Sequence, residues 1–165
     1  MSETEIRLCV VVGGVVFDEA AVSMEPECLS PFLFSTEGKL AGAWAYVLVQ
    51  NLQFRVRGRN FPEMEICQNK HEIGHVKGEI VTIYAGYAWN GMSCWPDTPT
   101  NLLGSGWHDF WYQVGKVVSR KDADLGLRHL LAVKKDEHVR KCYAAVRMCG
   151  WMFYGKTGGV TLVRI

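Results

Sequence analysis

The spacing of apolar residues changes near residue 98, and this change predicts a chain with two structurally different halves. Before this point apolar residues alternate with polar ones or form short β-branched runs, which is typical of strands. After it they recur every three or four positions, the period of an amphipathic helix. The chain has 165 residues, enough for one compact domain and too few for two of ordinary size. We therefore predict a single α+β domain over 1–165, with 1–97 mainly in strands and loops and 98–165 mainly helical.

Four segments carry the signals of strands. Three lie in the first half, at Arg7–Phe17, Trp44–Val56 and Glu79–Trp89, and the last of these closes at the Asn90-Gly91 turn. A short final strand is predicted at Val160–Ile165. We expect the first three to form a sheet that precedes the helical cluster.

Three helices are predicted in the second half, and capping residues set their ends. The first is capped by Thr98 or Thr100 and ends at Gly115, although two glycines inside it allow a start as late as Ser105. The second runs from a capping box at Ser119 to about residue 133. The third is expected from about residue 136 to about residue 153.

Charge excludes some classes of function. The formal net charge is +1, so the whole molecule has no electrostatic attraction for nucleic acid or for an anionic membrane. Residues 1–100 are net acidic, whereas 101–165 carry eleven Lys and Arg against five Asp and Glu. This basic third can meet an acidic surface or pair with the acidic part of the chain. We therefore predict no nucleic-acid partner.

The first residues and the cysteines favour a cytoplasmic protein. The chain begins with acidic residues where a signal peptide is basic, and the apolar run Cys9–Phe17 is too short to span a bilayer. The six cysteines are scattered without a CxxC pair, so we interpret them as reduced thiols. We expect no secretory signal peptide and no transmembrane segment.

Four of the six tryptophans fall between positions 89 and 111, around His108-Asp109. This pair is the starting point for a candidate catalytic site. On a helix, His108 and Tyr112 are one turn apart and share a face. In the next helix Asp124 lies in the apolar stripe, where a carboxylate needs a partner. A short connection makes the two helices an antiparallel hairpin that brings Asp124 toward His108. A histidine oriented by a buried carboxylate is how a general base is built, so His108 and Asp124 are the predicted catalytic residues.

Four motifs in order resemble those of a phage and bacterial protein family of uncharacterised function. They are a WNG-S turn, an HD-x-x-Y helix, an R-x-x-AD helix and a VR-x-x-G helix, within Tyr87–Ser93, Gly106–Tyr112, Ser119–Asp124 and Tyr143–Gly150. The resemblance implies a phage-type accessory protein, with other virion proteins as partners and the virion as an alternative location. It implies no particular activity.

The His-Asp helix and the helix after it also resemble the helical hairpin of bacterial phospholipases of the A-two type. The resemblance implies that His108 is the base that activates water, that Asp124 orients it and that Asp109 is a calcium ligand. Calcium in such enzymes also takes backbone carbonyls from a preceding loop, which corresponds here to the Asn90-Gly91 turn. The chain departs from that family because it lacks a recognisable Gly-rich calcium loop and has no cysteines beside the His-Asp pair.

Two functions follow from the same residues. The first is a calcium-assisted ester hydrolase that acts on a lipid or another ester. The alternative is a non-enzymatic virion or assembly protein in which these residues fasten the helices together. In the hydrolase the His108 ring must open to a cleft, whereas in the structural protein Trp107, Trp111 and their neighbours should seal it.

A third function rests on His71-Glu72-Ile73-Gly74-His75, which matches the HExxH motif of zinc peptidases. That motif needs a stable helix to place both histidines on one face. Here glycines interrupt the segment and a β-rich run follows it almost at once. We therefore predict a turn between two strands at this place.

Overall fold

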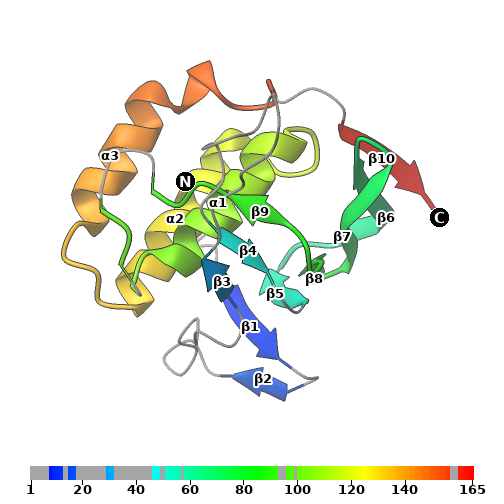
Figure 1. The fold of residues 1–165 in the computed structure, drawn as a ribbon, viewed down its shortest axis with the longest axis horizontal. Coiled ribbons are helices and arrows are strands. Elements are labelled where there is room, and N and C mark those ends of the chain that lie inside the picture. The colour runs from blue at the N-terminus through cyan, green and yellow to red at the C-terminus, as the bar shows by residue number, and fades with distance from the viewer. Residues whose placement is uncertain are drawn as a thin grey trace.

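The computed structural model describes residues 8–12, 15–17, 29–31, 46–48, 51–56, 58–92, 96–98, 100–156 and 160–165. Strands and three α-helices make up an α+β fold, which confirms the predicted class. Figure 1 shows the helices grouped on one side and most of the strands on the other. Among the described residues, no helix combines the length and the apolar character needed to cross a bilayer.

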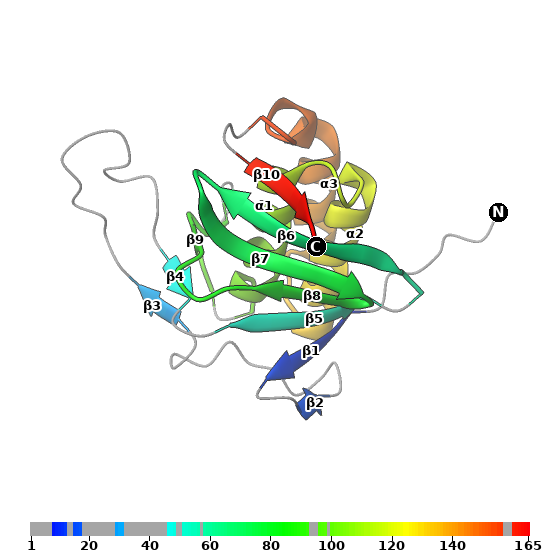
Figure 2. The same cartoon turned by 90° about the vertical axis from the view of Figure 1, so that its right-hand side faces the viewer.

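The larger sheet has seven antiparallel strands in the order β10-β6-β7-β8-β5-β1-β2. Their bounds are β1 Leu8–Val12, β2 Val15–Phe17, β5 Leu52–Val56, β6 Phe61–Gln68, β7 His71–Gly78, β8 Ile80–Ile83 and β10 Val160–Arg164. Figure 2 shows this sheet in front of the helices. The predicted C-terminal strand is confirmed, and it pairs with β6 at the edge of the sheet.

A smaller sheet of three strands lies beside the first, in the order β3-β4-β9. Its strands are β3 Leu29–Pro31, β4 Tyr46–Leu48 and β9 Ala88–Trp89. The helices are α1 Leu102–Val114, α2 Arg120–Val133 and α3 Val139–Cys149, and a single 3-10 turn, η2 Gly150–Met152, continues α3.

Helix α1 lies between the larger sheet and α2, which is why nearly all its residues are buried. Trp107 meets Phe54 of β5 edge-on with ring centroids 4.9 Å apart, and Trp111 stacks on Phe61 of β6 at 6.2 Å. On β5 the alternation of buried and half-buried residues is the period of a strand with one face on a core. Trp89, Trp107 and Trp111, three of the four tryptophans around the His-Asp pair, therefore belong to the apolar core, and the fourth, Trp95, lies outside the described residues.

Each of the three strands predicted in the first half is divided into two strands in the structure. The predicted strand Trp44–Val56 contains β4 and β5, which belong to different sheets because β4 pairs with β9 and β5 with β8. The run Glu79–Trp89 is broken between β8 and β9 by a turn in which Gly86 has φ +91°. Likewise Arg7–Phe17 contains the two paired strands β1 and β2.

The helix ends are closer to the predictions. Gly115 ends α1 in the left-handed conformation, and the Ser119 hydroxyl accepts a hydrogen bond from the backbone N–H of Asp122 at 3.1 Å, as a cap should. The cap position of α1 is Asn101, which corrects the prediction of Thr98 or Thr100. The Asn101 side chain bonds the preceding loop, through the N–H of Thr98 and the carbonyl of Pro96.

Gly74 of β7 supplies a test of how closely α1 packs on the sheet. A Cβ at this position would lie 2.6 Å from the Thr82 carbonyl oxygen and 2.8 Å from a ring carbon of Phe110. Gly74→Ala should therefore lower the free energy of unfolding by about 1–3 kcal/mol, measured by urea denaturation. Glu72→Ala, at an exposed position of the same strand, is the control and should have little effect. Equal stability of the two variants would contradict this packing.

Candidate functional site

Asp124 of α2 is fully buried and receives side chains from all three helices. Its Oδ1 accepts a hydrogen bond of 2.6 Å from the Tyr112 hydroxyl and lies 3.2 Å from His108 Nε2, both on α1. Its Oδ2 accepts a bond of 2.7 Å from Arg147 Nη1 of α3 and lies 3.6 Å from Arg120 Nη1. These five side chains are called the Asp124 cluster below. The structure thus brings together the two predicted catalytic residues, as the hairpin argument expected.

Two glycines allow the helices to approach this closely. A Cβ at Gly126 of α2 would lie 2.1 Å from Trp107 Nε1, and one at Gly150, which follows α3, would lie 2.1 Å from the Tyr112 hydroxyl oxygen. Arg120 adds a second link, because its Nη1 donates to the carbonyls of Val146 and Arg147 at the end of α3. The cluster therefore fixes the positions of α2 and α3 on α1.

The His108 ring has a carboxylate at each nitrogen. While Nε2 faces Asp124, Nδ1 lies 3.4 Å from Oδ1 of Asp109. Burial lowers the pKa of His108, but hydrogen bonds and charge attraction from these two carboxylates outweigh it, so the pKa is raised above 6.5. These surroundings shift the ring toward the imidazolium, the form that has no lone pair for accepting a proton.

The carboxylates differ in their electrostatics. Burial raises the pKa of Asp124, but hydrogen bonds from His108, Tyr112 and Arg147 outweigh this, so its pKa is lowered. Burial raises the pKa of Asp109, and contact with His108 only partly offsets it; the negative charge of Asp97 raises it further. Asp124 is therefore the firmly ionised member of the pair.

Access to His108 is restricted, since the residue is 8% exposed. The Tyr112 ring covers it, with centroids 3.8 Å apart. Among the residues expected to seal the ring in a structural protein, namely Trp107, Trp111 and their neighbours, the neighbour Tyr112 lies over it, whereas the two tryptophans pack on the sheet. A small pocket lies elsewhere, and none of its lining residues is His108, Asp109 or Asp124; it is lined by Val56, Arg59, Phe61, Trp107, Val117, Val118 and Asp122.

The Asn90-Gly91 turn wraps a carboxylate of the chain itself. The N–H of Met92 donates to Asp97 Oδ1 at 2.7 Å, and the Tyr46 hydroxyl donates to Oδ2 at 3.1 Å. A Cβ at Gly91, where φ is +75°, would lie 2.3 Å from Asp97 Oδ1, so only glycine fits here. Sequence reasoning missed this role of Asp97, since no local pattern marks a residue that folds back on the turn before it.

The calcium site predicted at Asp109 takes its other ligands from backbone carbonyls of the Asn90-Gly91 turn. Calcium binds six to eight oxygen ligands, and the negative charge of Asp97, which that turn wraps, acts on Asp109. In the described part of the chain, no group of three or more His, Cys, Asp or Glu side chains is placed to hold a metal ion. The proposed calcium ligands Asp109, Asn90 and Gly91 therefore need a direct binding test.

The HExxH segment does not form the predicted turn, because it lies within strand β7. The turn comes just before it, where Asn69 and Lys70 have positive φ. Residues four apart on a strand lie about 13 Å from each other, so His71 and His75 cannot share one zinc ion. His75 Nε2 instead lies 3.7 Å from Glu63 of β6.

Comparison with known proteins finds no matching family, no related curated protein and no similar solved structure. The resemblances to the phage family and to the phospholipases therefore stay predictions.

Replacing Asp124 tests how much the cluster contributes to stability. Asp124→Asn removes the charge that Arg147, Arg120 and His108 face, so the free energy of unfolding should fall by about 3–5 kcal/mol in a urea titration. Asp122→Asn is the matched control, since its partner Arg59 is half exposed and such pairs contribute about 0–1 kcal/mol. Similar losses in both variants would show that the cluster is not a major source of stability.

The raised pKa of His108 predicts a pH dependence of stability. The folded protein holds the proton more tightly than the unfolded chain, so this contribution is complete below pH 6.5 and is lost as the pH rises through the folded-state pKa. His108→Gln should flatten the fall in unfolding free energy above pH 6.5, and the exposed His71→Gln on β7 should not. An unchanged slope in His108→Gln would contradict the raised pKa of His108.

Proposed function

We propose that this chain is a non-enzymatic accessory protein of the phage type, a virion component or assembly factor that works by binding. The observation that carries the proposal is the state of His108, which is nearly buried and has a carboxylate at each ring nitrogen. A general base needs a neutral imidazole with a lone pair directed at the substrate. Here the surroundings favour the charged ring and leave little of it accessible.

The partners of Asp124 support the same proposal. An orienting carboxylate needs only to hold the histidine, yet Asp124 also faces Arg147 and Arg120. These arginines reduce the negative charge that would otherwise strengthen His108 as a base, and they link α3 to the hairpin. The arrangement suits a fastening of helices better than a proton transfer.

An ester hydrolase that acts on lipids is the second candidate, and one observation favours it. His108 Nε2 lies against Asp124 and the Tyr112 hydroxyl bonds the same oxygen, so Nδ1 is turned toward Asp109. This is the set of roles that the phospholipase resemblance implies for His108, Asp124 and Asp109. Calcium at Asp109 belongs to this candidate alone.

Hydrolysis assays separate the two candidates. Wild type, His108→Gln and Asp109→Asn are incubated with phosphatidylcholine vesicles and with a p-nitrophenyl ester, with calcium or with a chelator. We expect the wild type to hydrolyse no more substrate than His108→Gln does. The melting temperature should be lower in His108→Gln and unchanged in Asp109→Asn.

If the wild type is a hydrolase, the loss of activity in His108→Gln should have a defined size. Loss of a general base reduces a rate by about 10²–10⁴-fold, so wild-type hydrolysis that His108→Gln abolishes would replace the proposal with the hydrolase. Calcium at a hundredfold excess over its Kd should add about 2.7 kcal/mol of stability if a site exists. A calcium response present in wild type and absent from Asp109→Asn would establish that site.

A further inference from the structure

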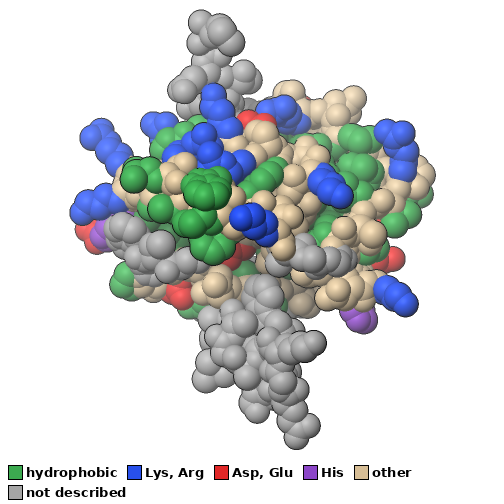
Figure 3. Space-filling view, turned by 90° about the horizontal axis from the view of Figure 1, so that it is seen from above, with side chains coloured by type: hydrophobic (Ala, Val, Ile, Leu, Met, Phe, Trp, Pro, Cys, Tyr) green, Lys and Arg blue, Asp and Glu red, His purple; other side chains and the backbone are tan. Residues whose placement is uncertain are grey.

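Large apolar side chains are exposed together where α3 ends and η2 begins. Met148 is 73% exposed, Trp151 63%, Met152 41% and Phe153 65%. Large apolar residues are normally buried, so a group of them on consecutive turns marks a surface with a binding role. These four residues are called the α3-end patch. It lies at the top of Figure 1, on the face that Figure 3 turns toward the viewer.

The α3-end patch lies in a segment without negative charge. Residues 139–165 contain five Lys and Arg and no Asp or Glu. Lys141 lies on the same helix face as Met148, seven positions earlier, and Lys156 Nζ lies 5.7 Å from the centre of the Trp151 ring. Figure 3 shows apolar side chains on this face with Lys and Arg side chains around them.

We infer that the α3-end patch docks on the surface of an anionic lipid bilayer. Tryptophan and phenylalanine side chains are favourable at the boundary between headgroups and acyl chains, and flanking Lys and Arg are attracted to anionic headgroups. The whole chain has almost no net charge, but a bilayer senses the local charge within a Debye length. The patch thus has the composition of an interfacial anchor.

Other occupants fit the patch less well. A second copy would bring the same cationic segment, 139–165, against itself, which is repulsive in a symmetric contact. A protein partner recognises side chains through complementary shape, so it would have to supply a groove fitted to these protruding side chains. A fluid bilayer accepts protruding side chains without a matching groove.

The inference extends the proposed function, since a protein that works by binding needs a surface to bind with. It does not depend on whether His108 is catalytic, because the α3-end patch shares no residue with the Asp124 cluster. Vesicle binding and ester hydrolysis are therefore separate measurements, and either can fail without the other.

The test is co-sedimentation of the full chain with vesicles of phosphatidylcholine, with and without phosphatidylglycerol. Each cation near an anionic surface increases the affinity for the membrane about fivefold. Phosphatidylglycerol should therefore raise the partition coefficient by at least about tenfold, and added NaCl should reverse the increase. The double variant Trp151→Ser/Phe153→Ser should lose binding. The matched control Val163→Ser/Ile165→Ser, at exposed apolar positions of the β10 end, should bind as wild type does.

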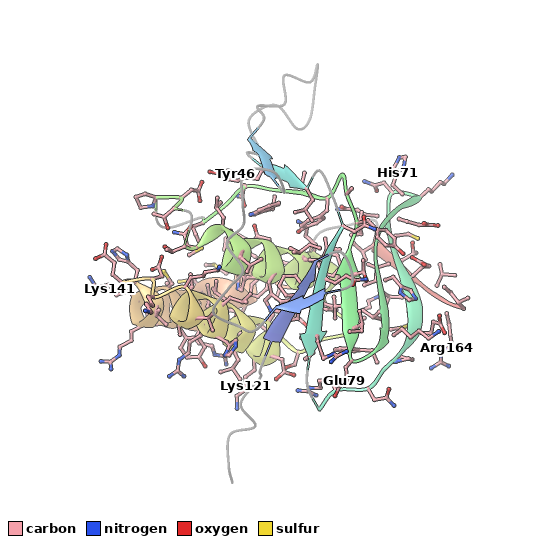
Figure 4. All side chains as sticks on the ribbon, turned by 90° about the horizontal axis from the view of Figure 1, so that it is seen from below. Tyr46, His71, Glu79, Lys121, Lys141 and Arg164 are labelled. Carbon is pink, nitrogen blue, oxygen red and sulfur yellow. The ribbon has the colours of Figure 1, made fainter. Side chains whose placement is uncertain are left out.

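Charge is tested separately with Lys141→Glu/Lys156→Glu, which should lose the preference for phosphatidylglycerol. Lys70→Glu is the control, since Lys70 precedes His71, which Figure 4 shows far from Lys141. All variants must keep the wild-type melting temperature, as expected for exposed positions. Wild type that stays in the supernatant, or Trp151→Ser/Phe153→Ser that binds like wild type, would overturn the inference. If the wild type is a dimer and Trp151→Ser/Phe153→Ser is a monomer, the α3-end patch binds a second copy, and the inference is overturned in this case too.

Discussion

The arrangement of the helices depends on one buried carboxylate. An ionised group out of water costs several kcal/mol unless polar partners surround it, and Asp124 is fully buried. Its partners come from α1, from α2 itself and from α3, so its burial is compatible with only one placement of the three helices. Gly126 and Gly150 then provide the close approach that these bonds require.

The same carboxylate explains why a structural and a catalytic interpretation compete for one site. A buried carboxylate beside His108 Nε2 orients the ring, which both interpretations need. The positive charge of Arg147 and Arg120 and the second carboxylate at Nδ1 distinguish them. Since the partners of Asp124 stabilise its charge and the two carboxylates stabilise the imidazolium, the balance favours a stable ion network over a base.

The molecule separates its apolar groups into two sets with different environments. Trp107 and Trp111 of α1 pack on the sheet, where Phe54 and Phe61 contact them. Trp151 and Phe153, beyond α3, stay exposed, and Lys156 lies over the Trp151 ring. Because the Asp124 cluster holds α3 against the hairpin, it also holds the exposed set in a fixed position, which links the stability of the core to the surface proposed to bind a bilayer.

Features that local chemistry controls could be predicted from the sequence. Ser119 caps α2 and Gly115 ends α1 because their bonds and backbone angles involve near neighbours, and the apolar stripe of α2 placed Asp124 toward His108. The sequence pattern did not show that β4 and β5 belong to different sheets, that His71 lies on a strand, or that Asp97 fills the Gly91 turn. The two sheets are separate because β4 pairs with the distant β9, and a local pattern carries no information about which distant segment will pair with it. The other two features arise where the chain folds back on itself nearby, since β7 pairs with β6 on one side and β8 on the other, and Asp97 returns to the turn before it.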